Sequence, residues 1–449
     1  MRLIWPFMLS FGLSILPPAT SALRAQAGAE EMRIARIQSG LEDIRGSKFK
    51  HPIKVATQSR EAFGQYIEQA LERQIPAGLL ENYDKVVRKL GLYRGPEIED
   101  FRTLARLVVQ SQAAAYYDPE KETFFVVMQE LPDQMLNVVY AHELYHGLQD
   151  QNFDLETYLV SPPESLNDDE LLARQSVVEG EATYVSQLWA MKNLFGTVPD
   201  RSALQIAIRM QAQMGVAELL QMVKSGAPSM VDSDQLQDAL HSLDDIPGFM
   251  LETMLGPYFK GMGFVFEIHA LGWEKVEALY GTPPMSTEQI LHPEKWLSNE
   301  IPMRLSWPGF EKESLFVGWN LLEANTLGEL RWRIIFAEHD LVSLATSAAA
   351  GWNGDSYAVL EQAQTGELLL LIASSWDSEK EATEFAQAYE QLLSFKYAGR
   401  TVNTRLRRMG TDVLILEGGE ERMAEPLLAF IKKMQKKKEP AHARQHLGK

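Results

Sequence analysis

Residues 142–146 read His-Glu-Leu-Tyr-His, and the sequence around them predicts a long helix that begins near Asp133. Side chains four positions apart on a helix differ by about 40° around its axis, so the imidazoles of His142 and His146 point the same way. Two imidazoles on one face can bind one divalent metal ion, and Glu143 is placed to take a proton from a water molecule beside that ion. This stretch therefore predicts a helical metal site and zinc-dependent hydrolysis.

Two strands and a second helix are expected on either side of this helix. Residues 113–117 and 123–128 predict the strands of a hairpin, because turn residues separate two runs that contain tyrosine and phenylalanine. The second helix is expected at 168–196 and carries Glu179. Small residues on it, such as Gly180, would allow close packing on a neighbouring element.

The rest of the chain predicts a mostly helical region followed by a mixed one. In the first region a strand is expected at 52–57, with helices at 60–73, 79–90, 98–111, 202–224, 233–243 and 248–280. In the second region strands are expected at 368–374, 402–408 and 413–417, with helices at 328–336, 379–393 and 421–435. Residues 351–357 are interpreted as a turn between elements. The fold class is therefore α+β: a mostly helical domain with a small β-hairpin or sheet over 28–300, then a smaller α+β domain of unknown role over 301–437.

The N-terminus predicts an export signal over residues 1–27. Arg2 supplies a positive start, and the apolar run over 3–16 is too short for a comfortable membrane span. Small residues at 20–22 and 25–27 provide cleavage sites. We therefore expect an exported, periplasmic or secreted protein without a stable membrane span after cleavage; the alternative is anchoring by an uncleaved N-terminal segment.

Composition limits the partners and the chemistry. The 43 Lys and Arg against 61 Asp and Glu give a formal net charge of −18, which argues against nucleic acid as the main partner. The tail over 438–449 is basic and is expected to be disordered. The chain has no cysteine, which excludes disulfides, a thiol nucleophile and a thiolate zinc site. The sequence leaves the oligomeric state open.

The third ligand has to come from outside the motif. A catalytic zinc takes three protein ligands and keeps a fourth position for water, and two histidines with one glutamate are an established set. Glu179 and Glu181 lead the candidates, although Asp150, Asp154 and Glu156 lie nearer in sequence.

The residues resemble the gluzincin metallopeptidases, the clan of thermolysin and the aminopeptidases. Residues 142–150 (His-Glu-Leu-Tyr-His-Gly-Leu-Gln-Asp) are similar to the thermolysin-type helix, and 179–185 (Glu-Gly-Glu-Ala-Thr-Tyr-Val) to the Glu-Gly-x-Ala segment of the aminopeptidase branch. The resemblance covers roughly residues 110–190. It implies a zincin-like fold, one Zn²⁺, a peptide or protein substrate, and Glu179 rather than Glu181 as the ligand.

The chain departs from the gluzincins in one spacing. The 33 residues from His146 to Glu179 exceed the gap in the best-known branches, and an extra loop over 154–167 would account for the difference. The chain is also similar to uncharacterised bacterial HExxH proteins that share a Ser-Thr-Glu-Gln-Ile-Leu-His-Pro-type segment, here residues 286–293.

The expected mechanism assigns roles to further residues. Glu143 would accept the proton of water and later pass it to the leaving amine. In the gluzincins a histidine or tyrosine from a later helix stabilises the oxyanion, and the candidates here are His292 first, then Tyr258 and His269. The alternative for His292 is a structural or surface role. The strand at 113–117 would bind substrate as an added strand, or is an ordinary hairpin strand.

Two acidic residues are expected to support the ligands rather than to bind the metal. Asp150 would hold a zinc-binding histidine in its tautomer, or is an ordinary surface acid. Glu181 would be structural or would stand behind the ligands. Two other functions remain as alternatives, a catalytically silent zinc-binding envelope protein and a zinc hydrolase of a non-peptide bond. Glu143 favours an enzyme, since structural zinc sites usually close with four ligands.

Overall fold

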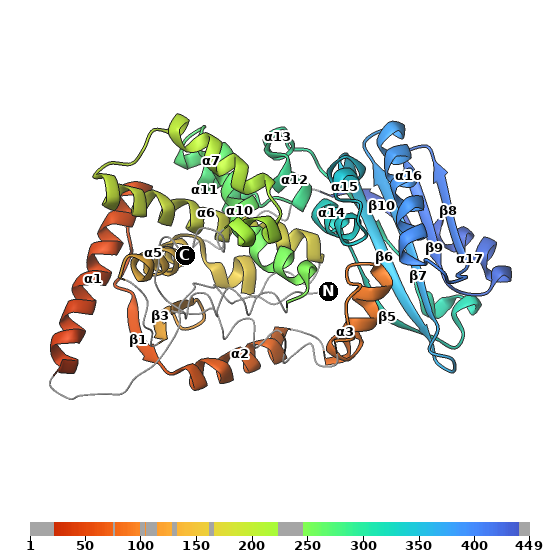
Figure 1. The fold of residues 1–449 in the computed structure, drawn as a ribbon, viewed down its shortest axis with the longest axis horizontal. Helices are drawn as coiled ribbons and strands as arrows, with labels where there is room; N and C mark the ends of the chain where they lie inside the picture. Colours follow the sequence, from red (N-terminus) through yellow and green to blue (C-terminus); the bar gives the residue numbers. More distant parts are fainter. Residues whose placement is uncertain are drawn as a thin grey trace.

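The computed structural model describes residues 22–74, 77–98, 104, 115–127, 133–160, 166–222 and 246–439. The fold is α+β, as predicted, with a helical N-terminal part and a sheet-rich C-terminal part (Figure 1). The expected helix at 233–243, nearly all of the one at 98–111, and most of the expected signal and basic tail lie outside the described residues. Within the described residues no helix is both long enough and apolar enough to cross a membrane.

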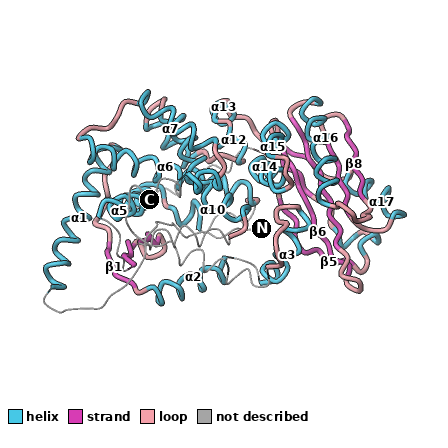
Figure 2. Tube along the Cα trace, in the orientation of Figure 1, coloured by secondary structure: helices cyan, strands magenta, loops and turns pink. Residues whose placement is uncertain are grey.

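The N-terminal part contains most of the helices (Figure 2). Its elements are α1 (Ala22–Arg45), β1 (Lys54–Gln58), α2 (Arg60–Gln74), α3 (Ala77–Leu90), β2 (Ala115–Asp118), β3 (Thr123–Val127), α5 (Asp133–Phe153), the π-helical turn η1 (Glu156–Val160), α6 (Asp168–Phe195), α7 (Arg201–Gln213), α10 (Gly248–His269), α11 (Trp273–Gly281), α12 (Thr287–Leu291) and α13 (Pro293–Leu297). The single helix expected over 248–280 is two helices, because Gly272 at φ 97° redirects the chain between them. The expected helix at 202–224 is interrupted after Gln213.

Helix α6 is defined at both ends by its sequence. Asn167 and Glu170 form a reciprocal capping box at its start, and Gly196 ends it at φ 79°. Gly180 in its middle faces Gly261 of α10 so closely that a Cβ on Gly180 would lie 2.1 Å from the carbonyl carbon of Gly261. The small residue therefore allows the close helix crossing that was expected, and the crossing lies one residue from Glu179.

A three-stranded sheet lies beside α5, with the order β1-β3-β2. Strands β2 and β3 form the predicted antiparallel hairpin, in which Tyr116 pairs with Phe125. Strand β1 pairs with β3 in parallel, with Ala56 opposite Phe125. Strand β2 is thus an outer strand of this sheet among the described residues.

The C-terminal part is an antiparallel sheet with the order β5-β6-β7-β9-β8. Its elements are β4 (Met303–Ser306), the 3₁₀ turns η3 (Phe310–Lys312) and η4 (Ser314–Phe316), β5 (Trp319–Asn325), α14 (Gly328–Glu338), α15 (Val342–Ala349), β6 (Trp352–Gln362), β7 (Leu368–Trp376), α16 (Glu379–Lys396), β8 (Thr404–Met409), β9 (Asp412–Glu417), η5 (Glu421–Met423), α17 (Ala424–Ile431) and β10 (Gln435–Lys438). Both faces of β7 are buried: Leu370 and Ile372 join the cluster that contains α16, and Leu369 and Leu371 join the cluster that contains α17. Burial on both faces explains the continuous apolar run of this strand.

The interpretation of residues 351–357 as a turn is wrong, because β6 begins at Trp352. The polar residues in this stretch are satisfied by neighbouring elements. Buried Asp355 accepts from the backbone N–H groups of Leu327 (2.8 Å) and Gly328 (3.0 Å) at the start of α14. It also accepts from the indole N–H groups of Trp332 (3.0 Å) and Trp352 (2.6 Å). Three of these four donors, Leu327, Gly328 and Trp332, lie at the start of α14 or within it, so contacts with another element stabilise the local structure.

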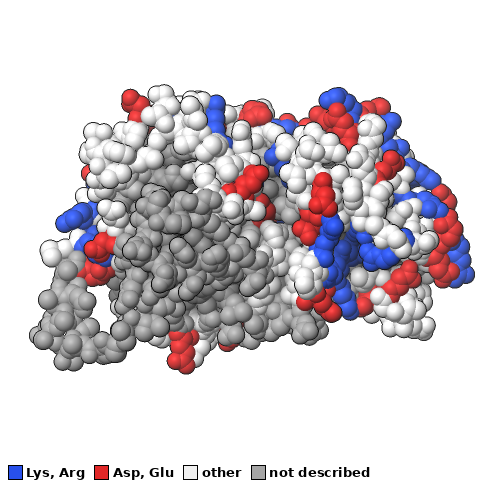
Figure 3. All heavy atoms as spheres, in the orientation of Figure 1, with Lys and Arg blue, Asp and Glu red and all other residues white. Residues whose placement is uncertain are grey.

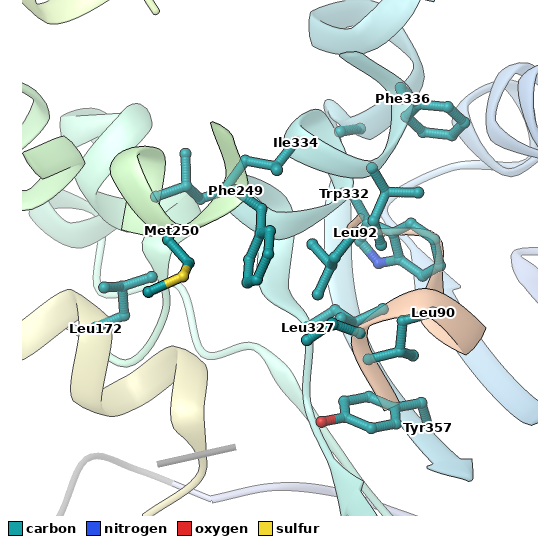
Figure 4. Packing of buried hydrophobic residues seen from close by; sticks show 14 of the residues in the cluster. Leu90, Leu92, Leu172, Phe249, Met250, Leu327, Trp332, Ile334, Phe336 and Tyr357 are labelled. Atoms are coloured by element: carbon teal, nitrogen blue, oxygen red, sulfur yellow. The ribbon is translucent and has the colours of Figure 1, made fainter. Parts of the chain in front are cut away.

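One of the hydrophobic clusters spans both parts. Figure 4 shows Leu90 of α3, Leu172 of α6 and Phe249 of α10 packed toward Trp332 of α14 and Tyr357 of β6, all within one buried cluster. The expected domain boundary at residue 300 falls between α13 and β4, where the secondary structure changes, but the core continues across it. Helix α3 in particular packs on the C-terminal sheet although its sequence lies in the N-terminal part.

Candidate metal centre

Three buried side chains come together between α5 and α6. His142 and His146 lie on α5 and Glu179 lies on α6, and one ligand atom from each lies within 4.8 Å of the other two. The Nε2 atoms of the two histidines are 3.0 Å apart, and Glu179 Oε2 lies 3.2 Å from that of His142 and 3.6 Å from that of His146. The imidazole rings are nearly perpendicular, at 81°. The structure thus brings together the three residues expected to bind a metal ion.

The spacing and the chemistry of this cluster fit a zinc ion. Ligand atoms at about 2.0–2.1 Å from a tetrahedral zinc lie about 3.3 Å from each other, and the three observed separations bracket that value. Glu179 Oε1 is buried and has no hydrogen-bond partner among the described residues. Burial lowers the pKa of His142, which keeps this imidazole neutral. Burial would raise the pKa of Glu179, but the two histidines outweigh it and hold the pKa below its usual value.

Gln149 fixes the tautomer of His146. The amide oxygen of Gln149 lies 2.7 Å from His146 Nδ1. Its amide nitrogen donates to the carbonyl of Val178 (3.0 Å), to Glu181 (3.1 Å) and to the hydroxyl oxygen of Tyr280 (2.7 Å). Because a carbonyl and a carboxylate only accept, the amide nitrogen must face them and the amide oxygen must face His146. His146 therefore carries its proton on Nδ1, and its Nε2 lone pair points to the cluster.

Glu181 lies behind the cluster and does not enter it. Its Oε1 accepts from Arg45 (2.9 Å) and the hydroxyl of Tyr145 (2.8 Å), and its Oε2 accepts from Tyr280 (2.5 Å) and Gln149 (3.1 Å). Arg45 is the last residue of α1 and is buried. A chain of hydrogen bonds thus runs from α1 through Glu181 and Gln149 to His146. Glu181 therefore contacts Gln149, which in turn contacts His146.

Glu143 is fully buried on α5 beside the small sheet. Its Oε2 accepts from the backbone N–H of Tyr117 on β2 at 3.1 Å. The carboxylate is therefore anchored to the outer strand that precedes the metal helix. This contact connects the two features that were expected to act on substrate, the carboxylate of Glu143 and the edge of the sheet.

Tyr258 is the oxyanion-donor candidate that the structure brings to the cluster. Its ring stacks on His142, with centroids 5.5 Å apart and planes at 15°. Tyr258 lies on α10 next to Pro257, which lacks an N–H for the helix. The crossing of α10 over α6 at Gly261 brings this segment to the metal cluster.

His292, the first choice, lies elsewhere. Its Nε2 is 3.1 Å from Glu329 of α14 and 3.4 Å from Arg333, and the side chain is 29% exposed. His292 ends α12, and both of these ring contacts come from residues of α14. The expectation that His292 stabilises the oxyanion is therefore corrected. His269 is also occupied elsewhere, since its Nδ1 pairs with the hydroxyl of Tyr184 at 3.0 Å.

Asp150 was expected to hold the tautomer of a histidine, but the residue that contacts His146 Nδ1 is Gln149. Asp150 accepts from the hydroxyl of Tyr117 (2.7 Å) and from the backbone N–H of Leu155 (2.8 Å), and burial raises its pKa. Adjacent helix residues differ by about 100° around the axis, so when Gln149 faces α6, Asp150 faces the sheet. Asp150 thus supports the junction of α5 and β2 and does not hold a histidine.

The longer spacing between His146 and Glu179 is filled in part by η1, which follows α5 after a left-handed Asp154 at φ 57°. Residues 161–165 of the expected extra loop lie outside the described residues.

A second acidic cluster contains a lysine. Glu288, Glu300 and Asp377 converge within 4.8 Å, and the ammonium of Lys295 lies 2.7, 2.8 and 2.5 Å from their carboxylates. Burial would lower the pKa of Lys295, but these carboxylates outweigh it and raise the pKa. This ammonium lies among the three acids and pairs with each of them, and burial raises the pKa of Glu288 to about 9, so the cluster is an ion-pair network.

The sequence did not identify the residues that orient His146. Gln149 was detectable in principle, because it lies three positions after His146 and so on the same helix face. No sequence pattern pointed to Arg45 or Tyr280, because both lie on elements far from His146 in the sequence and neither is part of a motif.

The C-terminal part is similar to a known family. The family described as "Domain of unknown function (DUF8575)" matches residues 318–426, from β5 into α17. The matched segment does not include the metal cluster. No curated protein and no solved structure matches the chain.

Proposed function

We propose that this protein is an exported, zinc-dependent metallopeptidase of gluzincin type. The observation that carries the proposal is the convergence of His142 and His146 of α5 with Glu179 of α6, together with Glu143, which lies on α5 between the two histidines. Two observations support it: Oε1 of Glu179 is buried and has no hydrogen-bond partner among the described residues, and the tautomer of His146 leaves the lone pair of Nε2 free to bind a cation. The resemblance of the two motifs to the gluzincins supports peptide cleavage.

Each residue has a role in this proposal. His142, His146 and Glu179 hold one zinc, which as a Lewis acid lowers the pKa of water toward 7. Glu143 accepts the proton of the attacking water and donates it to the leaving nitrogen. The hydroxyl of Tyr258 donates a hydrogen bond to the oxygen that becomes negative.

Substrate would lie along β2. An extended peptide can add to an outer strand through backbone hydrogen bonds, which tolerates many sequences. Because Tyr117 N–H holds Glu143, a peptide placed there lies with its backbone close to this carboxylate. Because backbone pairing tolerates many substrate sequences and requires an extended chain, an unfolded protein is a suitable assay substrate.

The test compares metal content and cleavage. Purified wild type is expected to contain about one zinc per chain and to cleave an unfolded protein. Glu143→Gln should keep the zinc and lose cleavage, while the same substitution at exposed Glu274 should change neither. Equal cleavage by wild type and Glu143→Gln refutes the peptidase. Zinc without cleavage by wild type favours a silent zinc-binding protein or a hydrolase of another bond.

The ligand assignment has its own control. Glu179→Ala should lose the zinc, whereas Glu181→Gln should bind it more weakly and still retain it. The opposite pattern would show that Glu181, and not Glu179, is the ligand.

A further inference from the structure

A cavity of about 860 Å³ lies between α3 and the C-terminal sheet, remote in sequence from the metal motif. Its charged lining is strongly asymmetric, with a single carboxylate, Glu367, against the cations Arg88, Lys89, Arg94, Lys396 and Arg400. Figure 3 shows Lys and Arg gathered on this face, in the region of α3 and the neighbouring sheet. Such a gathering is unexpected in a chain with a net charge of −18.

Two of these arginines are neutralised by nearby acids. Arg88 pairs with Asp84 at 2.7 Å, and Arg94 pairs with Asp340 at 2.9 Å. Both pairs lie along the rim formed by α3 and the segment after it. They therefore contribute little net charge to the cavity.

Lys396 is neutralised from within the sheet. Its ammonium lies 2.6 Å from Glu417, which is fully buried at the end of β9. The same Glu417 oxygen accepts from the hydroxyl of Tyr397 at 2.5 Å, and the other oxygen accepts from Tyr389. This carboxylate is thus fully engaged.

Among the described residues, no carboxylate oxygen lies within 4.0 Å of a side-chain nitrogen of Lys89 or Arg400. The Lys89 ammonium donates to the hydroxyl of Tyr397 at 3.3 Å, and Arg400 donates to the carbonyl of Lys396 at 2.8 Å. Gly418 at φ 98° keeps the space beside Lys89 open, because a Cβ there would lie 3.3 Å from the ammonium.

We propose that this cavity binds a small phosphate-bearing molecule, with the phosphate group between Lys89 and Arg400. A phosphate carries close to two negative charges at neutral pH, so it can neutralise both cations together, whereas one carboxylate neutralises one. The volume is within the range of small-molecule sites, about 300–1,000 Å³. Tyr93 and Phe395 supply apolar surface for the rest of the ligand.

The electrostatics of Lys89 agree with this proposal. Burial lowers the pKa of Lys89 to about 8; Glu417 and Glu367 oppose the shift, while Lys396 and Arg400 add to it. A bound anion would relieve this penalty. The site combines residues of the segment similar to DUF8575 with α3, which lies outside that segment. It does not depend on the proposed peptidase.

The experiment measures binding of inorganic phosphate, a phosphate monoester and acetate to the full chain by calorimetry. Phosphate and the monoester should bind at one site, and acetate at least tenfold more weakly. Lys89→Met and Arg400→Gln should each weaken phosphate binding at least tenfold. Lys85→Met is the matched control on the same helix, where the lysine is exposed and pairs with Glu361, and it should leave binding unchanged.

The outcomes separate clearly. Arg400 is exposed, so Arg400→Gln tests the proposal even if Lys89→Met fails to fold. Absence of phosphate and monoester binding by wild type overturns the proposal, as does equal binding by wild type and Arg400→Gln. Acetate binding as tightly as phosphate refutes the phosphate assignment.

Discussion

Replacing Gly180 by alanine should force α6 and α10 apart and weaken the metal centre. A Cβ at this position would lie 2.1 Å from the carbonyl carbon and 2.4 Å from the carbonyl oxygen of Gly261. Both atoms belong to the backbone, so a rotamer change cannot relieve the clash. Carbon atoms in ordinary contact are about 3.5–4.0 Å apart, which requires the helices to separate by about 1.4 Å or more.

The magnitude follows from two opposing terms. Overpacking a close contact costs about 1–3 kcal/mol, and a backbone clash belongs at the upper end of that range. Alanine regains about 1 kcal/mol over glycine within a helix. We expect a net loss of about 2 kcal/mol in the free energy of unfolding. Zinc affinity should fall too, because Glu179 is the neighbouring residue.

Thermal unfolding and zinc competition with a chelator measure both effects. Gly281→Ala is the matched control, since a Cβ there meets nothing within 4 Å, and it should unfold at or above the wild-type midpoint. If Gly180→Ala unfolds like this control and binds zinc like wild type, the close crossing of α6 and α10 is refuted.

Three further predictions concern the two sites. Gln149→Leu should weaken zinc binding about 10–100-fold in a chelator competition, because His146 loses the partner that sets its tautomer; unchanged affinity would contradict this role. Tyr258→Phe should lower kcat about 10²–10³-fold with zinc content unchanged, whereas His292→Gln should leave kcat at the wild-type value; the reverse pattern would restore His292 as the donor. Phosphate affinity should fall as the pH rises through about 8, by at most tenfold per pH unit, because burial lowers the pKa of Lys89 to about 8 and the ammonium is lost above that pH. Affinity that is flat from pH 7 to 9.5 would show that Lys89 is not a ligand.

The regular elements were largely predictable. Helix α5 and the hairpin of β2 and β3 follow from periodicity and turn residues, and α6 follows from the capping pair at Asn167 and the terminal Gly196. Strands β4, β5, β6 and β10 were not predicted, and the helix expected over 421–435 ends at Ile431. Strand β6 carries polar residues that suit a turn in isolation. Its strand conformation is stabilised by Asp355, which accepts from Leu327, Gly328 and Trp332 at α14 and from Trp352 of the strand itself. Local propensity could not anticipate that set of partners.

The sequence by itself determined the arrangement of the two histidines that we propose as metal ligands. The helix repeat alone places His142 and His146 on one face, so no other element is needed to predict them. Only the tertiary structure decided what surrounds them: Gln149 rather than Asp150 at His146, and Tyr258 rather than His292 at His142. The cavity between α3 and the sheet likewise exists only in the folded chain. The reason is physical, since spacing within a helix is fixed by covalent geometry, whereas contacts between distant segments depend on how whole elements pack.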